Sequence, residues 1–314
     1  MTALLLPIFG LVALGWACRR FGVLGPRAGA ELSAYVMALA LPALLFDIVA
    51  HLALRQLGRP GLAAAFALGS ALAFALPQLG RARRGIEPAD AALDGLCASY
   101  PNTGFIGLPL ALLVFGPVAG PGAAIVVVLT TCVLYGAAVV VLEVATRQRA
   151  SRPATARAVL RSLLRNPVLL APALGLALGA GGWALPDGVQ RIVGLLAASA
   201  GPCALLSLGL FLARGGRGRV AGIVSPAPWR RVAAVALVKL VVQPAVTALL
   251  AVRVFGLAPL ETQLVVLLSA LPTGTGAFVL AGFYRRDAAA ASLAILVTTV
   301  ASAATLPVLL WLLR

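Results

Sequence analysis

The sequence predicts an all-α polytopic membrane protein, and two observations carry that prediction. Hydrophobic residues make up 61% of the 314 residues and charged residues 11%, with a mean hydropathy of +1.04, whereas soluble domains are about 45–50% apolar. Apolar segments of about 20 residues, the length that crosses the hydrocarbon core of a bilayer, recur along the chain. The net charge of +16 does not indicate nucleic-acid binding, because the arginines lie between apolar segments and form no solvated basic face.

Ten segments are predicted to be transmembrane helices. The first has no basic region before its apolar run and is followed by Arg19 and Arg20, so we expect it to stay in the mature protein. The ten predicted spans are residues 2–18, 32–50, 61–80, 91–116, 121–145, 167–185, 190–213, 232–252, 262–283 and 288–313.

Arginine is distributed unequally between the two sides of the predicted membrane. The loops after spans one, three, five, seven and nine hold 19 arginines, and the opposite side holds 5. Because basic loops stay in the cytoplasm, we expect an integral plasma (inner) membrane protein with both termini extracytoplasmic. We call the side with 19 arginines the arginine-rich side.

A basic cytoplasmic loop, residues 146–166, divides the chain into two predicted five-helix repeats, residues 1–145 and 167–314. An odd number of spans per half inverts the second half relative to the first. Inverted repeats with interrupted spans are typical of secondary transporters that bind substrate near the midplane. Prolines recur at matching places in the halves: Pro7 with Pro172, Pro42 with Pro202, and Pro101 with Pro272.

Three arginines in this loop have helical spacing. Arg157, Arg161 and Arg165 are four residues apart, and apolar residues occupy the other side of the helical wheel. This pattern fits an interfacial helix on anionic lipid and equally fits a simple determinant of topology.

Spans four and nine are predicted to be broken inside the membrane. Span four contains the sequence SYPNTGFIGLP, residues 99–109, and span nine contains ALPTGTGAFV, residues 270–279. Proline removes a backbone donor and glycine permits non-helical backbone, so the freed groups must face protein, water or a solute. The predicted helix-breaking residues are Pro101, Pro109 and Pro272.

Each break is expected to leave a helix N-terminus inside the membrane. Its unpaired amides and positive dipole end attract an anion. Asn102 and Thr273 are predicted to hold one carboxylate between them. The predicted substrate-binding residues are Asn102, Thr103, Gly104, Thr273, Gly274 and Thr275.

These motifs resemble the auxin efflux carrier family of membrane transporters. The resemblance covers the whole chain and rests on Pro101-Asn102-Thr103 with Gly107-Leu-Pro109, and on Leu271-Pro272, Gly274 and Ala277-Phe278-Val279. It implies a five-plus-five inverted-repeat fold in which spans four and nine cross at their prolines. It also implies that Asn102 is among the ligands of the substrate carboxylate, and that spans one, two, six and seven form a scaffold for a mobile unit holding four and nine.

The length of the central loop narrows what the resemblance implies. Plant members have a long cytoplasmic loop, so regulation through that loop does not transfer to a chain with about twenty residues there. Short-loop members occur in bacteria and are associated with malonate or other small carboxylates.

Two ionisable residues within predicted spans are candidates for charge compensation or coupling. Lys239, the only lysine, could neutralise the substrate, take part in proton coupling, or tie down free carbonyls at the breaks. Asp47 could pair with Lys239, bind a coupling ion, or lie at the membrane interface beside His51. Glu143 is expected to pair with Arg147 one helical turn away.

The leading hypothesis is a secondary active transporter that moves a small organic anion, a carboxylate such as malonate or an auxin-like acid, by alternating access. The alternatives are an anion channel and a membrane sensor or assembly subunit without transport. No catalytic motif suggests an enzyme, and neither a metal site, a cofactor nor a nucleic-acid partner is expected. Proton or sodium coupling and a homodimeric state are both left open.

Overall fold

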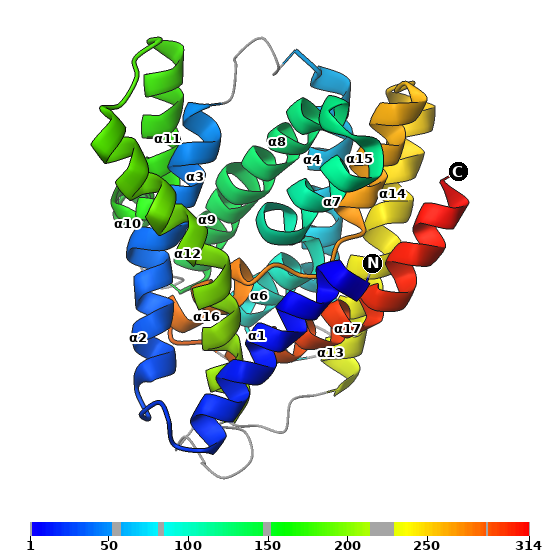
Figure 1. Cartoon of the computed structure of the whole chain (residues 1–314). Coiled ribbons are helices and arrows are strands. Elements are labelled where there is room, and N and C mark those ends of the chain that lie inside the picture. Colours follow the sequence, from blue (N-terminus) through cyan, green and yellow to red (C-terminus); the bar gives the residue numbers. More distant parts are fainter. Residues whose placement is uncertain are drawn as a thin grey trace.

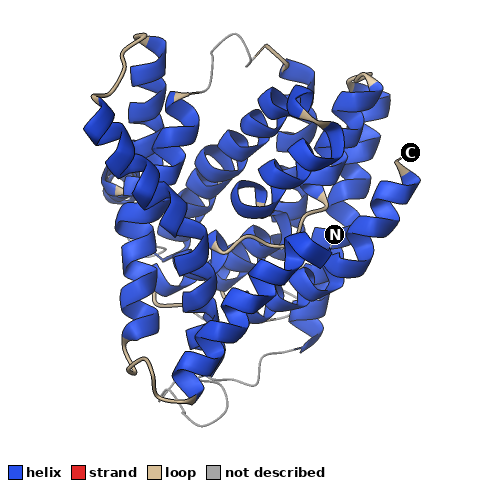
Figure 2. Cartoon of the chain, in the orientation of Figure 1, coloured by secondary structure: helices blue, strands red, loops and turns tan. Residues whose placement is uncertain are grey.

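The computed structural model describes residues 2–51, 58–80, 85–146, 152–213, 229–286 and 288–313. Within these ranges the chain is helical and contains no strand (Figure 2). The predicted all-α class is therefore confirmed.

The helices lie close to the predicted apolar segments. In the first half they are α1 (Thr2–Arg20), α2 (Ala28–Tyr35), α3 (Leu41–Ala50), α4 (Pro60–Leu79), α6 (Pro88–Ser99), α7 (Leu108–Phe115), α8 (Gly120–Val128) and α9 (Tyr135–Thr146). In the second half they are α10 (Arg152–Arg165), α11 (Pro167–Ala180), α12 (Asp187–Leu212), α13 (Trp229–Leu237), α14 (Gln243–Leu249), α15 (Pro259–Ser269), α16 (Gly276–Phe283) and α17 (Ala288–Leu312). Short π-helical turns join α2 to α3, α8 to α9 and α13 to α14.

Length and composition identify six of the described helical segments as able to cross a membrane, or seven if α10 and α11 form one span bent by 63°. The count of ten spans and the inverted relation of the halves stay predictions. Span six is shorter than predicted, because α11 ends at Ala180 and not near residue 185.

Helical structure is interrupted at Pro101 and at Pro272. Helix α6 ends at Ser99 and α15 ends at Ser269, and the chain resumes helical structure at Thr103 and Gly276. The predicted break at Pro109 is wrong. Pro109 lies at the start of α7, where a helix tolerates the missing amide, and a π-helical turn, Thr103–Gly107, runs directly into it.

The helices form two groups. Helices α1, α2–α3, α11 and α12 pack on one another toward the left and front of Figure 1. Helix α4 packs on α6 and α14, and α14 packs on α15; α4, α14, α15 and α17 lie toward the right. The two broken segments belong to the second group.

Small residues allow close helix contacts within the first group. A Cβ atom added to Gly175 of α11 would lie 2.6 Å from the Phe46 carbonyl oxygen of α3, and one at Gly179 would lie 2.7 Å from the Ala50 oxygen. Glycines four residues apart let helices approach closely in membranes, where packing drives association.

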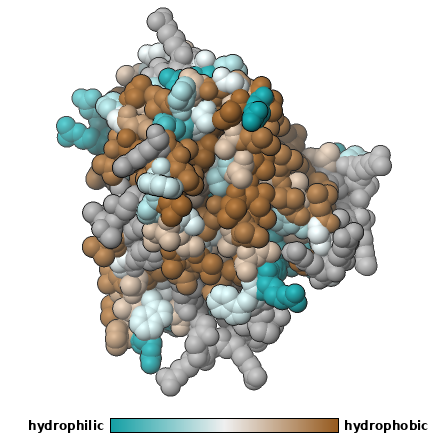
Figure 3. All heavy atoms as spheres, turned by 90° about the vertical axis from the view of Figure 1, so that its right-hand side faces the viewer, coloured by the Kyte–Doolittle hydropathy of each residue, from teal (hydrophilic) through white to brown (hydrophobic). Residues whose placement is uncertain are grey.

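The outer surface is largely apolar. On the face shown in Figure 3, brown hydrophobic atoms cover much of the middle, and teal hydrophilic residues lie mainly toward its upper and lower parts. Exposed leucine, valine and tryptophan side chains on α4, α14 and α17 contribute large hydrophobic groups: Leu68, Leu72, Leu76, Leu249, Val300, Val308 and Trp311. This exterior suits a lipid environment.

Candidate functional site

The two broken segments meet and pair through their backbones. Pro101 and Thr273 form an isolated antiparallel bridge. The Asn102 amide donates to the Pro272 carbonyl at 2.9 Å, and the Gly274 amide donates to the Tyr100 carbonyl at 2.8 Å. Backbone groups freed by the prolines therefore satisfy one another at the crossing, as buried polar groups must in a membrane.

Glycine is required where the second segment passes Tyr100. A Cβ atom at Gly274 would lie 2.8 Å from two ring carbons of Tyr100, and one at Gly276 would lie 2.9 Å from its ring and hydroxyl. Any larger residue would push the Tyr100 ring away and open the bridge.

Both helix N-termini line one small cavity of about 30 Å³. Asn102, Thr103 and Gly104 contribute from the first break, and Gly274, Thr275 and Gly276 from the second. Ordinary ligand pockets have roughly 300–1,000 Å³, so this cavity is far smaller. A carboxylate therefore fits only if the surrounding helices move apart.

Several donors at this cavity have no partner within the described ranges. The Thr103 hydroxyl is buried and makes no hydrogen bond there. The Asn102 side chain, 7% exposed, also has none, and no backbone acceptor is found for the Gly104 amide. An orphaned buried hydroxyl costs about 1–3 kcal/mol, which a ligand could recover.

Thr273 has a different geometry from the other predicted site residues. Its hydroxyl donates to the Cys97 carbonyl at 2.7 Å, and its amide donates to the Thr298 hydroxyl at 3.1 Å. It does not line the cavity. The expectation that Asn102 and Thr273 face one carboxylate thus needs revision, because Thr273 fastens the second break to α6 and α17.

Lys239 lies outside the cavity lining and holds helix ends. It is fully buried in the turn Val238–Val242, and its Nζ donates to Gln243 Oε1 and to the Ser269 carbonyl, both at 2.7 Å. Gln243 Nε2 in turn donates to the Ser99 carbonyl at 2.9 Å and to the Ser70 hydroxyl at 3.1 Å. Ser99 and Ser269 are the last residues of α6 and α15, so this pair caps both helices at the breaks.

The family model described as "Membrane transport protein" matches residues 1–310. The chain belongs to this family, that of the auxin efflux carriers. It is 31% identical over 319 residues to the "Putative malonate transporter" of Rhizobium meliloti, covering 100% of this chain and 96% of the relative. It is 27% identical over 213 residues to an "Uncharacterized transporter" of Methanothermobacter thermautotrophicus, covering 67% of this chain and 68% of the relative. The family is one of membrane transporters and not of enzymes.

Asp47 does not pair with Lys239, which is one of the alternatives that the sequence leaves open. Asp47 Oδ1 accepts a hydrogen bond from Gln190 Nε2 at 2.7 Å and lies 3.4 Å from the His51 ring, whereas Lys239 uses Gln243 and Ser269. Glu143 accepts a hydrogen bond from the Tyr284 hydroxyl at 3.1 Å, and its predicted partner Arg147 lies outside the described residues.

Sequence reasoning missed Gln243, Tyr100 and Thr298. Gln243 could have been found, because a polar residue one helical turn after Lys239 in an apolar span needs a buried partner. Tyr100 and Thr298 carry no such signal, since their roles depend on contacts with distant segments.

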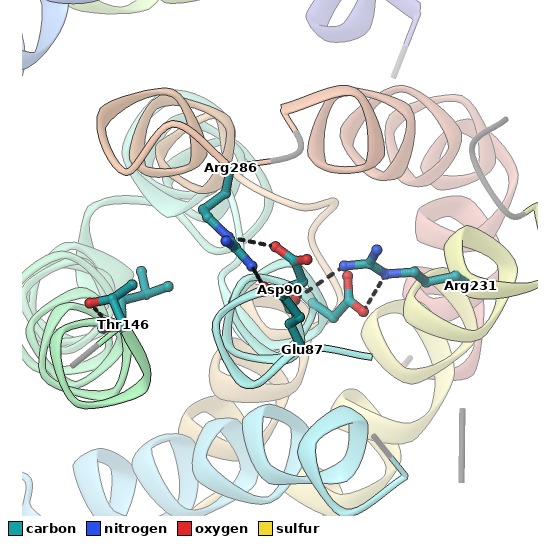
Figure 4. A network of polar contacts seen from close by, with 7 residues as sticks. Glu87, Asp90, Thr146, Arg231 and Arg286 are labelled. Atoms are coloured by element: carbon teal, nitrogen blue, oxygen red, sulfur yellow. Dashed lines mark hydrogen bonds and ion pairs between the residues drawn. The ribbon is translucent and has the colours of Figure 1, made fainter. Parts of the chain in front are cut away.

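A charged network lies at the other end of α6 in this transporter (Figure 4). Arg231 of α13 binds Asp94 at 2.6 Å and the Asp90 carbonyl at 3.2 Å. Arg286, in the turn between α16 and α17, binds Asp90 at 2.9 Å and also contacts Glu87. The hydrogen bond and the positive charge of Arg286 lower the pKa of Glu87. The network joins α6, α13 and the end of α16.

Proposed function

We propose that this protein is a secondary active transporter of a small carboxylate, and that the anion binds where the two broken segments cross. The observation that carries the proposal is the meeting of two helix N-termini at one cavity, where the Thr103 hydroxyl and the Asn102 side-chain amide have no partner among the described residues. Helix N-termini present amides and a positive dipole end to anions.

The donors at the crossing fit the chemistry of a carboxylate. Each carboxylate oxygen accepts more than one hydrogen bond, and Asn102, Thr103 and the Gly104 amide offer donors from one side. Thr275 and Gly276 offer the start of α16 from the other side. Thr273 and Lys239 then act as positioning residues that hold the two breaks together.

The arrangement of helices supports alternating access. The cavity, about 30 Å³, is far smaller than ordinary ligand pockets of roughly 300–1,000 Å³, so loading of an organic anion requires movement of the helices around it. The separate packing of α1, α2–α3, α11 and α12 provides a body against which the crossing segments can move.

Malonate is the first candidate substrate because the relative with 31% identity is named for malonate. An auxin-like acid is the second, since it presents the same carboxylate to the crossing. The test is uptake of labelled malonate and of an indole acid by proteoliposomes under separate proton and sodium gradients. Gradient-driven accumulation of either acid is expected. Current without accumulation would indicate a channel. The absence of both flux and current would reject transport.

Two substitutions at the crossing test the site itself. Asn102→Ala should weaken malonate binding about ten- to more than a hundredfold, the value of one charge-assisted hydrogen bond of roughly 1.5–3 kcal/mol, with normal expression. Thr103→Val should also weaken binding, yet should leave the free protein at least as stable, because it removes a buried hydroxyl without a partner.

Thr130→Val is the matched control, since the buried Thr130 hydroxyl already donates to the Val126 carbonyl at 2.8 Å within its own helix. Calorimetric binding and thermal unfolding of the three variants separate affinity from stability. Unchanged malonate affinity in well-folded Asn102→Ala would place the site elsewhere.

A further inference from the structure

A second cavity, of about 800 Å³, lies beside α10. Its lining includes Arg157, Arg161 and Arg165 of α10, Glu143 of α9 and Phe283 of α16. We call this cavity the arginine vestibule. Helix α10 packs on α9 and α11 at the left of Figure 1.

The vestibule carries unpaired positive charge. None of the three guanidinium groups makes an ion pair or hydrogen bond with a residue that the structure describes. Glu143 supplies one opposing carboxylate, and that group accepts a hydrogen bond from Tyr284. Three cations against one anion leave the cavity positive.

The arginines of α10 lie next to a helix that is short for a membrane span, so their side chains need a water-filled cavity. Helix α11 has 14 residues, about 21 Å at the helical rise, and is shorter than the roughly 30 Å hydrocarbon core. Residues Val159–Arg165 are long and apolar enough to cross a membrane only together with α11, across the 63° bend. Charged side chains in such a segment face protein or a water-filled cavity, and Arg161 and Arg165 face the vestibule.

The vestibule leads toward the crossing. Ala34, Met37 and Phe283 line both the vestibule and a neighbouring cavity of about 290 Å³. Val279, one helical turn before Phe283 on α16, lines both that cavity and the crossing. The three cavities therefore form a row from the arginines to Asn102.

We propose that the arginine vestibule is a second binding site for a small carboxylate, occupied on the way between the arginine-rich side and the crossing. Guanidinium groups bind carboxylates through paired, charge-assisted hydrogen bonds. The choice of malonate as the anion rests on the proposed function. The site itself is inferred from the arginines and the cavity, independently of that function. A lipid phosphate shares the same chemistry, so the experiment must separate the two.

The test uses the full chain in nanodiscs of neutral phosphatidylcholine, with Cys18, Cys97, Cys132 and Cys203 replaced by alanine and Ala34→Cys introduced as a reporter. The rates of thiol modification by a sulfonate-bearing and by a trimethylammonium-bearing methanethiosulfonate are compared. Combined Arg157→Gln and Arg161→Gln should lower the ratio of the sulfonate to the trimethylammonium rate about three- to tenfold, because attraction between nearby charges is strong at low salt. Malonate should protect Ala34→Cys in the parent and not in the double variant.

The reporter Gly25→Cys is the control, because Gly25 is exposed, lies in the α1–α2 loop and has open space for a Cβ atom. Its rate ratio should not change. Protection should persist in Asn102→Ala, so a failure of the crossing as transport site is distinguishable from a failure of the vestibule. An unchanged ratio, or no malonate protection, would overturn the proposal. Loss of protection in phosphatidylglycerol nanodiscs would also overturn it, by assigning the arginines to lipid.

Discussion

At the scale of single residues, Lys239 and Gln243 show how a broken helix is stabilised inside a membrane. The last carbonyls of α6 and α15 lie at the breaks, and Gln243 and Lys239 donate to them. Helix C-termini carry partial negative charge. The Lys239 ammonium and the Gln243 side-chain amide therefore stabilise the C-termini of α15 and α6. The lysine therefore has a structural task whether or not it also influences the substrate.

Lys239→Met should destabilise the folded protein by about 2–4 kcal/mol, because the Ser269 carbonyl and Gln243 Oε1 would lose their donor in a buried site. Thermal unfolding in detergent measures the loss. Gln243→Met should also destabilise, and the double variant should lose less than the sum, since the two residues share one network. A Lys239→Met protein with native stability and no transport would instead assign Lys239 to the transport cycle.

At the scale of the elements, the local effect of proline is predictable and its tertiary setting is not. Pro101 and Pro272 interrupt their helices, as the sequence indicates, because the missing amide is a property of the residue itself. Pro109 does not, because a π-helical turn before it leads into a helix start that needs no donor. Thr273 could not be assigned from sequence, since its hydroxyl partner, Cys97, is 176 residues away.

The contact of α11 with α3 gives a prediction for helix packing. Gly175→Ala should lower thermal stability, because the new Cβ atom would lie 2.6 Å from a backbone oxygen that cannot easily move. Gly194→Ala in α12 is the matched control. Nothing lies within 4 Å of its added Cβ, so the higher helix propensity of alanine, worth up to about 1 kcal/mol, should raise stability. Equal effects of the two changes would argue against the close α3–α11 contact.

The contact of Arg286 with α6 gives a prediction for pH dependence. The pKa of Glu87 is lowered from 4.5, first by the hydrogen bond from Arg286 and then by its charge. The stabilisation is therefore present above pH 4.5 and is lost as pH falls through the lowered pKa. Unfolding temperatures of the parent and Glu87→Gln should differ slightly at neutral pH and converge in acid. A constant difference down to pH 3 would show that the pair contributes nothing.

At the scale of the whole molecule, the sequence indicates the class, the approximate helix positions and the two breaks, because these follow from hydropathy and proline. It could not predict the length of α10 or the arginine vestibule. Both depend on how residues 152–165 pack against α9 and α11. The Gln190 partner of Asp47 is likewise a contact between distant helices.

The arginine distribution gives a prediction for topology. Reporter fusions at Arg314 and at Ser151 should report opposite sides of the membrane, with the central segment cytoplasmic, because 19 arginines lie on one side and 5 on the other. Paired phosphatase and fluorescent-protein fusions measure this. Identical reports from both positions would contradict the ten-span arrangement.

The antiparallel bridge at the crossing has a mechanical consequence. The two chain segments run in opposite directions through the bridge; the turn that leads into α7 begins at Thr103, and α16 begins at Gly276. Two backbone hydrogen bonds join the two segments at the bridge, so α7 and α16 can tilt together as one rigid unit about this point. A tilt that swings the far end of α16 away from its neighbours would swing the far end of α7 the other way. In the proposed transport cycle, opening the access on one side and closing it on the other would then be a single rigid motion about the proposed anion site.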